Sequence, residues 1–548
     1  MKKKFMVLFI VCVMTIGVVA CSRNGGDSSS PSSDASQKTS SVESTASSEL
    51  VDIWAPYNDA VTLTVGIPQN AGITFPEGQD YDKNIWYTMF KDEFNIQLEN
   101  LWVSANHSTQ VNLAMASDSL PDVFSTDGAT LELLVAGGLV ADITEIYDTY
   151  ASEQIKSFQE MDDTIFQTAV YDGKLYGIPK LSCGLIDQPN HVWIRKDWKE
   201  SLNLSDPETI DDLINIAKLF MEEYGGYGIG ETQDLYTFNI LAPAWGAYPK
   251  IWVETADGTL GYGSIQPEMK EALTAFAQWY KDGILDPDFA ISNMAKMFEA
   301  NINGEIGIQP HGRGGWGYYP GVDVVSNLGE EAIFQAYGIP SANGETVKAP
   351  VNFANNGYIV ISKNCKNPEA VIKLVNYYIK MLTTKDPADA ELILELFSNG
   401  LPNIVHSIYM DNPVSDYNQY VDISAALESG DTSTLGTSLS KYNDIVDYMT
   451  NATPKAVGNY LQQGDPKSAY SVSKKILDDN NIIKNEMWGL PTETIANSGS
   501  TLDDILIQGF TQIIVGDQPV DYFDILIESW KSAGGDQATA EINETYGN

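Results

Sequence analysis

The chain has 548 residues, of which 43% are hydrophobic and 10% aromatic, and its 74 acidic and 32 basic residues give a formal net charge of −42. This length is enough for two or three lobes with cores of ~150 residues each. So negative a surface repels phosphate backbones and anionic lipid, which argues against nucleic acid as a partner. No HExxH, CxxC, GxSxG or Walker-type motif occurs, so we expect neither a metal nor a cofactor, and no nucleotide chemistry.

The first fifty residues indicate an export signal followed by a tether. Three lysines precede an apolar run over residues 5–20, and Cys21 follows directly. A positive start, a short apolar run and a small residue before the cut are the parts of such a signal. The position of Cys21 resembles a bacterial lipobox, so we expect residues 1–20 to be removed and Cys21 to carry a lipid. Residues 21–50 are predicted to be a flexible tether. The alternative is a transmembrane anchor, for which the run is short against the ~20 residues needed.

Folded sequence is predicted from Val51 onward. Residues 61–65 alternate between apolar and polar as a strand does, a helical region follows, and residues 96–98 alternate again. This order indicates a βαβ unit and a sheet with parallel character. Short buried strands are also predicted at residues 305–308 and 358–361. Together these elements predict a mixed α/β protein.

Two helices have clear start and stop signals. Thr209 and Asp212 resemble a capping box, an apolar stripe follows them, and Gly225 stands at the end. Pro267 is placed to start the second helix and Gly283 to end it. Both stripes are typical of packing helices and carry no functional signal.

Six segments occur in an order that resembles one protein family. They are Leu120–Phe124, Gly137–Ile143, Asp172–Pro179, Trp193–Trp198, Trp279–Pro287 and the final pair Ile514–Asp517 with Trp530–Gly535. In this order they resemble the extracellular solute-binding proteins of family 1. The nearest branch is that of the large lipoproteins that serve carbohydrate ABC importers in Gram-positive bacteria.

The resemblance implies an α/β fold of the two-lobed, type II periplasmic-binding-protein kind, with a hinge and a ligand cleft between the lobes. By resemblance, the chain crosses the hinge near residues 181–192 and again near residues 353–358. Lobe one would hold residues 51–180 plus about 357–400, and lobe two residues 181–356 plus about 401–548. A ligand that touches both lobes only when the cleft is closed stabilises the closed state.

The function that the resemblance implies is capture of a carbohydrate, in particular an oligosaccharide, and its delivery to the permease subunits of an ABC transporter. The protein would be a monomer on the outer face of the cytoplasmic membrane, held by its N-terminal lipid only, and would not be an enzyme. A sensor accessory that presents the ligand to a membrane kinase stays open as an alternative. So does a peptide or amino-acid binding protein, which would need a cation such as Arg313 or Lys180. A secreted glycosidase or lyase would need two carboxylates at a defined separation.

Sugar sites combine flat aromatic rings with a few polar groups that bind hydroxyls. Trp245 and Tyr248 form one aromatic loop, and Arg313 and Trp316 lie in a glycine-rich loop that follows a predicted strand. In relatives, the loop after that strand often carries a stacking tryptophan, so Trp316 is the first candidate. The competing interpretation is that both clusters are packed surface loops.

Further candidate ligand-binding residues come from other loops. Asp127 and Asn70 follow predicted strands, whose carboxyl ends are where α/β sheets bind ligands. Ser182 lies at the first hinge crossing, and Trp488 lies in another aromatic loop. For Asp127 the competing interpretation is an exposed turn residue.

Two further expectations concern charge and cysteines. Arg313 beside Trp316 would suit a uronate carboxylate, whereas the net charge repels anionic sugars at a distance. We therefore expect a neutral or mildly acidic oligosaccharide. Cys183 and Cys365 either pair or remain two buried thiols. The acidic calcium loop of some relatives is missing at residues 222–228, so no calcium is expected there.

Overall fold

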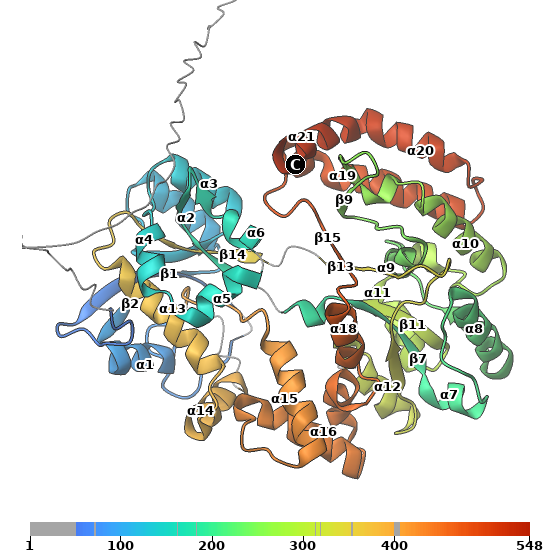
Figure 1. Ribbon diagram of the computed structural model, residues 1–548, viewed down its shortest axis with the longest axis horizontal. Helices are drawn as coiled ribbons and strands as arrows, with labels where there is room; N and C mark the ends of the chain where they lie inside the picture. Colours follow the sequence, from blue (N-terminus) through green and yellow to red (C-terminus); the bar gives the residue numbers. More distant parts are fainter. Residues whose placement is uncertain are drawn as a thin grey trace, which may run out of the picture. The chain divides into compact units, whose positions relative to one another are not determined.

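The computed structural model describes residues 51–70, 73–161, 163–181, 184–312, 314–317, 319–351, 355–398 and 406–547 (Figure 1). Residues Val51–Asn548 form one compact unit. The expected signal, the lipidation site Cys21 and the tether lie outside the described residues, as do Ser182, Cys183 and Arg313. Within the described part of the chain, no helix combines the length and the apolar character that crossing a membrane requires.

The first sheet has five strands in the order β2-β1-β3-β14-β6. β1 (Val61–Pro68) pairs in parallel with β2 (Ile96–Ser104), and α1 (Ile85–Phe94) connects them. The predicted βαβ unit is therefore confirmed. β3 (Val123–Thr126) also runs parallel to β1. The carboxyl ends of these three strands consequently lie along the same edge of the sheet.

Two later strands complete this sheet. β14 (Asn355–Ile361) is antiparallel both to β3 and to β6 (Ile178–Leu181). The chain thus returns to the first sheet after a long excursion, and the strand predicted at residues 358–361 is confirmed. Helix α13 (Pro368–Leu382) follows and begins with proline at its first position, where no backbone N–H is needed.

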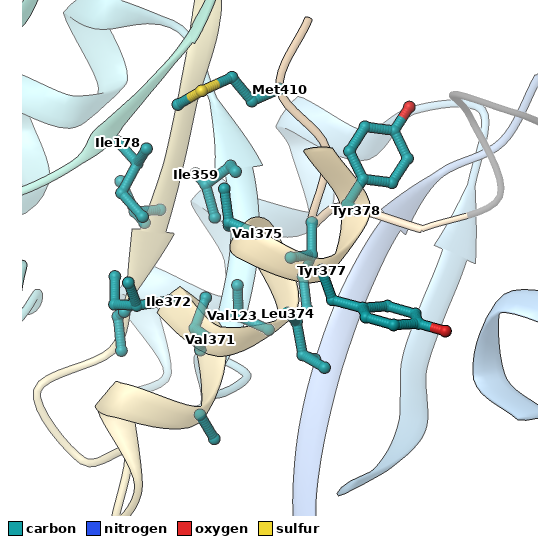
Figure 2. Packing of buried hydrophobic residues seen from close by; sticks show 14 of the residues in the cluster. Val123, Ile178, Ile359, Val371, Ile372, Leu374, Val375, Tyr377, Tyr378 and Met410 are labelled. Carbon is teal, nitrogen blue, oxygen red and sulfur yellow. The ribbon is translucent and has the colours of Figure 1, made fainter. Parts of the chain in front are cut away.

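Helix α13 packs against the first sheet and is buried on all sides over residues 370–379. Figure 2 shows its apolar side chains beside Val123 of β3, Ile178 of β6 and Ile359 of β14. Met410 belongs to the same core. The first core therefore combines residues 61–181 with residues 358–410, and its integrity depends on the returning segment.

The second sheet has four strands in the order β12-β7-β11-β8. β7 (Asn190–Arg195) is antiparallel to β11 (Ile306–Gly312) and to β12 (Phe334–Tyr337). β8 (Tyr227–Ile229) runs parallel to β11. The strand predicted at residues 305–308 is the first part of β11.

The two helices with clear sequence signals pack on this second part of the chain. α8 (Ile210–Tyr224) has the capping box of Thr209 and Asp212, and α10 (Met269–Lys281) begins two residues after Pro267. Their stripes enter a second core that also contains residues of α19 (Glu493–Ile514) and α20 (Tyr522–Trp530). Both predicted helices are confirmed.

Arg195, at the end of β7, has a structural role. Its guanidinium donates to both carboxylate oxygens of Asp197, at 2.8 and 2.6 Å, and lies 4.5 Å above the ring of Trp198. Cys365 carries a free, half-buried thiol, and burial raises its pKa to about 12.

The remaining helices and strands complete the two parts and the segments between them. In chain order they are α2 (His107–Ala116), α3 (Gly128–Ala136), α4 (Thr144–Tyr150), α5 (Glu153–Met161), α6 (Asp163–Gln167), β4 (Val170–Tyr171), β5 (Lys174–Leu175), α7 (Lys196–Ser201), α9 (Tyr236–Leu241), β9 (Trp252–Glu254), β10 (Leu260–Tyr262), α11 (Met294–Ile302), α12 (Gly321–Leu328), β13 (Ala349–Val351), α14 (Pro387–Ser398), α15 (Ser415–Ser429), α16 (Leu439–Asn451), α17 (Val457–Asn459), α18 (Ala469–Asp478), β15 (Ile482–Lys484) and α21 (Asp536–Tyr546).

Candidate functional site

A cavity of about 520 Å³ lies at the carboxyl ends of β1, β3 and β6. We call it the first cavity. Its lining mixes polar and apolar surface and comes from four strands, two helices and a loop near the C-terminus; it includes Pro68, His107, Asp127, Lys180, Asn355 and Leu490. The carboxyl edge of a sheet is where α/β folds place their ligands, so this cavity is the candidate site.

Two glycines allow the walls of the first cavity to approach one another. Gly357 has a φ of +102°, and a Cβ there would lie 2.5 Å from the carbonyl oxygen of Thr126. At Gly128, a Cβ would lie 2.3 Å from a methyl group of Leu490. These residues bring β14 and the loop at residue 490 against the end of β3, and side chains there would force them apart.

Asp127 lines the first cavity and also caps a helix. One carboxylate oxygen accepts a hydrogen bond of 2.8 Å from the backbone N–H of Thr130, in the first turn of α3. The side chain is exposed and its orientation is set by this bond. The structure therefore places Asp127 where a ligand could contact it, and such contact stays a prediction.

The capping role of Asp127 predicts different stabilities for two variants of this residue. Asp127→Ala is expected to lower the free energy of unfolding by about 1 kcal/mol, because an N–H of α3 loses its acceptor. Asp127→Asn keeps an acceptor oxygen and is expected to stay close to the wild type. Urea denaturation of both variants measures the difference, and equal losses in the two would contradict the capping role.

His107 lines the first cavity as a neutral ring. Its Nδ1 accepts a hydrogen bond from Trp102 Nε1 at 3.1 Å, so Nε2 carries the proton and donates to the carbonyl of Ser125 at 2.8 Å. Burial lowers the pKa of His107, and Lys180 lowers it further. Both ring nitrogens are engaged, which fixes the ring in the wall of the cavity.

Lys180 is the buried cation of the first cavity. The residue is 4% exposed, and its Nζ lies 3.5 Å from the centre of the Tyr409 ring. Burial lowers the pKa of Lys180 to about 7, against an opposing effect of Asp411. One sequence signal marked it, namely a charged residue within the otherwise apolar strand β6, but the sequence did not indicate which groups surround it.

A second cavity of about 520 Å³ adjoins the first, since Gly489 and Leu490 line both. Its walls come from the α3 to β4 region, from the loop after β15 and from α21, and include Glu132, Tyr171, Trp488, Glu493, Glu541 and Tyr546. The rings of Trp488 and Tyr546 pack edge to face, with 5.3 Å between their centres. Tyr546 Oη donates a hydrogen bond to the carbonyl of Leu490. Aromatic and carboxylate groups thus line one cavity. Trp488, which the sequence predicts as a ligand-binding residue, is one of these aromatic groups.

The structure places Trp316 in a core. It lies in a 3-10 turn (Gly314–Gly317) and is 0% exposed. Its ring stacks on that of Trp193, with 6.1 Å between the ring centres, and packs edge to face against Phe298 and Phe334. A ring enclosed in this way offers no face to a sugar. The glycine beside it, Gly317, allows close contact with α17, because a Cβ there would lie 2.7 Å from the carbonyl oxygen of Gly458.

The other sequence candidates lie apart from the two cavities. Trp245 is half-buried and packs on Trp279 at 5.9 Å in the second core. Tyr248 is half-buried in the same loop. Asn70 is exposed two residues beyond β1, and its backbone N–H donates to Tyr81 Oη at 2.9 Å. Roles for these residues in ligand binding stay predictions, as do those of Ser182 and Arg313.

The described residues contain no group of three or more His, Cys, Asp or Glu side chains placed to hold a metal ion. The groups that line the two cavities offer hydrogen-bond donors and acceptors, aromatic rings, carboxylates and one buried lysine.

Comparison with known proteins identifies the family. The family model described as bacterial extracellular solute-binding protein matches residues 76–381. Lipoprotein LipO of Bacillus subtilis is 22% identical over 476 residues, which are 82% of this chain and 86% of that protein. The polygalacturonan/rhamnogalacturonan-binding protein YtcQ of the same organism is 23% identical over 487 residues, with the same coverage.

The fold agrees with this match. The solved structure of the HMO-binding, ABC-transporter-associated solute-binding protein of Bifidobacterium longum infantis superposes with a TM-score of 0.56 at 14% identity, over 89% of this chain and 98% of that one. This likeness confirms the α/β fold of the type II periplasmic-binding-protein kind. The chain belongs to the bacterial extracellular solute-binding protein family.

Proposed function

We propose that this protein captures an oligosaccharide in the two adjoining cavities and delivers it to the permease of an ABC transporter. The observation that carries the proposal is that the two cavities share lining residues, Gly489 and Leu490, and so lie next to each other. Each has a volume typical of small-molecule sites, and a ligand of several linked rings would extend from one into the other. The printed names of YtcQ and of the Bifidobacterium protein, which describe carbohydrate binding, support this class of ligand.

The two cavities offer complementary contacts to such a ligand. In the first, Asp127, Asn355 and Ser108 provide acceptors and donors for sugar hydroxyls. In the second, Trp488 and Tyr546 provide apolar ring surface. Oligosaccharides present both hydroxyl edges and apolar ring faces, so one molecule can use both sets.

The walls of the cavities come from both cores, which supports closure around the ligand. His107 and Lys180 belong to the part built on the first sheet, whereas Tyr546 packs against the second core. We propose that these parts are the two lobes, and that the first continues to about residue 410, because Met410 lies in the first core. A ligand held by both lobes stabilises the closed form, which is the form proposed to dock on the permease.

We further propose that the mature protein is a monomer attached to the outer face of the cytoplasmic membrane through a lipid on Cys21. Residues 21–50 would then act as the tether, and the folded part would reach the permease from the membrane surface. The protein would bind its ligand without turnover, as a member of a family of binding proteins.

Trp488→Ala is expected to weaken oligosaccharide binding by about tenfold, because one aromatic contact contributes ~1 kcal/mol beyond the area that it buries. Trp488→Phe keeps a ring and is expected to retain most of the affinity. Isothermal titration calorimetry of the two variants with the same oligosaccharide measures the effect. Equal affinity in Trp488→Ala and the wild type would place the ligand elsewhere.

A further inference from the structure

Lys180 differs from the other buried lysines of the described chain in what surrounds its ammonium group. Lys199 forms an ion pair with Asp206, and Lys373 Nζ donates to the carbonyl of Ala55 at 2.6 Å. For Lys180, by contrast, no ion pair or hydrogen bond joins its Nζ to any described residue, and Nζ lies over the face of the Tyr409 ring. Of the three, Lys180 is the one that lines the first cavity.

A buried ammonium without a partner is unfavourable, since it has lost water and gained no anion in exchange. The ring of Tyr409 offsets part of this loss through its π-electrons. Lys180 also lines the first cavity, which is the space that a ligand could enter beside it. An anion that entered the cavity beside Lys180 would therefore stabilise the buried ammonium.

The other titratable groups around Lys180 do not supply that anion. Asp411 attracts the ammonium, but the two are not in an ion pair, and burial raises the pKa of Asp411. His107 on α2 and the buried His406 are both held neutral, since burial and the charge of Lys180 lower their pKa values. The carboxylate of Asp127, the N-cap residue of α3, forms no ion pair with Lys180 and is oriented by its bond to the first turn of that helix.

We propose that Lys180 Nζ binds a carboxylate of the ligand, so that the oligosaccharide taken by this protein contains a uronic acid residue. This inference rests on the proposed function and names the chemical class of its ligand. The carboxylate would lie at the Lys180 side of the first cavity. Asp127, a carboxylate that also lines this cavity, would repel a second anion there and accept hydrogen bonds from neighbouring sugar hydroxyls instead.

The binding of an anion beside Lys180 favours the charged ammonium. Because the pKa of Lys180 is about 7 in the free protein, part of the population is neutral at pH 7.5 and must take up a proton on binding. The expected signature is net proton uptake with a uronide and none with a neutral sugar. It appears in calorimetry as a binding enthalpy that depends on the ionisation enthalpy of the buffer.

The test titrates the chain from Val51 onward, which forms a compact unit, with oligogalacturonates, oligoguluronates and oligoglucuronates and with the fully methyl-esterified form of each. Lys180→Met keeps the length of the side chain and removes its charge. Lys363→Met, at an exposed position outside both cavities, is the matched control. Melting temperatures of all three proteins establish that each is folded.

The expected result is that the wild type and Lys363→Met bind one of the acids at least about tenfold more tightly than its ester, and that Lys180→Met loses this preference. Tighter binding of an ester than of any acid, or an acid preference that survives in Lys180→Met, overturns the inference and leaves the proposed function standing. Binding of no oligosaccharide, acidic, esterified or natively neutral, overturns the proposed function and the inference with it.

Discussion

Trp316→Ala is expected to lower the free energy of unfolding by about 3–5 kcal/mol. The ring is fully buried and packs on Trp193, Phe298 and Phe334. Its removal leaves a cavity that the surrounding aromatic rings cannot refill, and the lost contacts add to the lost transfer free energy. Urea denaturation measures the change, with unfolding followed by far-UV circular dichroism because the substitution alters tryptophan fluorescence.

Trp316→Phe is the control for this prediction. Trp316 Nε1 has no hydrogen-bond partner among the described residues, so phenylalanine removes volume without removing a polar contact. Its cost is expected to be less than half that of alanine. If Trp316→Ala kept wild-type stability and lost only ligand affinity, the ring would be a stacking surface, and its burial would not describe the ligand-binding state.

Lys180→Met is expected to raise the free energy of unfolding by about 1–4 kcal/mol in the absence of ligand, as replacement of buried charges by packed apolar groups often does. Burial lowers the pKa of Lys180 from 10.5 to about 7. The unfolded chain therefore binds more protons than the folded one between these values. The wild type carries the full penalty below pH 7 and loses it as the pH rises towards 10.5.

The stability difference between Lys180→Met and the wild type should accordingly be largest at pH 6 and shrink between pH 7 and 10.5. Guanidinium denaturation across this range provides the measurement. Lys363→Met, with an exposed side chain, should stay within ±0.5 kcal/mol of the wild type, a range typical of surface substitutions. A loss of stability in Lys180→Met would mean that the ammonium has a partner in the free protein.

The elements of this fold with strong local signals were predictable from the sequence. The capping box at Thr209 and Asp212 is an interaction between residues three apart, and the alternation in β1 and β2 reports one buried face. Such patterns depend on neighbours along the chain, so they survive without knowledge of the tertiary structure. The family resemblance added the connectivity that these patterns lack.

The site was less predictable, because its residues are distant in sequence. His107, Lys180 and Leu490 come together only when β6, α2 and the loop after β15 are packed. A glycine-rich loop with a tryptophan fits both an open binding loop and a tightly packed turn. In the structure Trp316 is buried. The glycine beside it, Gly317, allows the loop to pack closely on the backbone of α17.

Calorimetric titration of the chain from Val51 onward with oligosaccharides, followed by chromatography of the mixtures, determines whether this protein captures an oligosaccharide and leaves it intact. We expect saturable, equimolar binding of an oligosaccharide that is recovered unchanged, and stabilisation by about 2.7 kcal/mol at a hundred times its Kd. Saturable binding of peptides or amino acids alone, or the release of shortened sugar products, would contradict it.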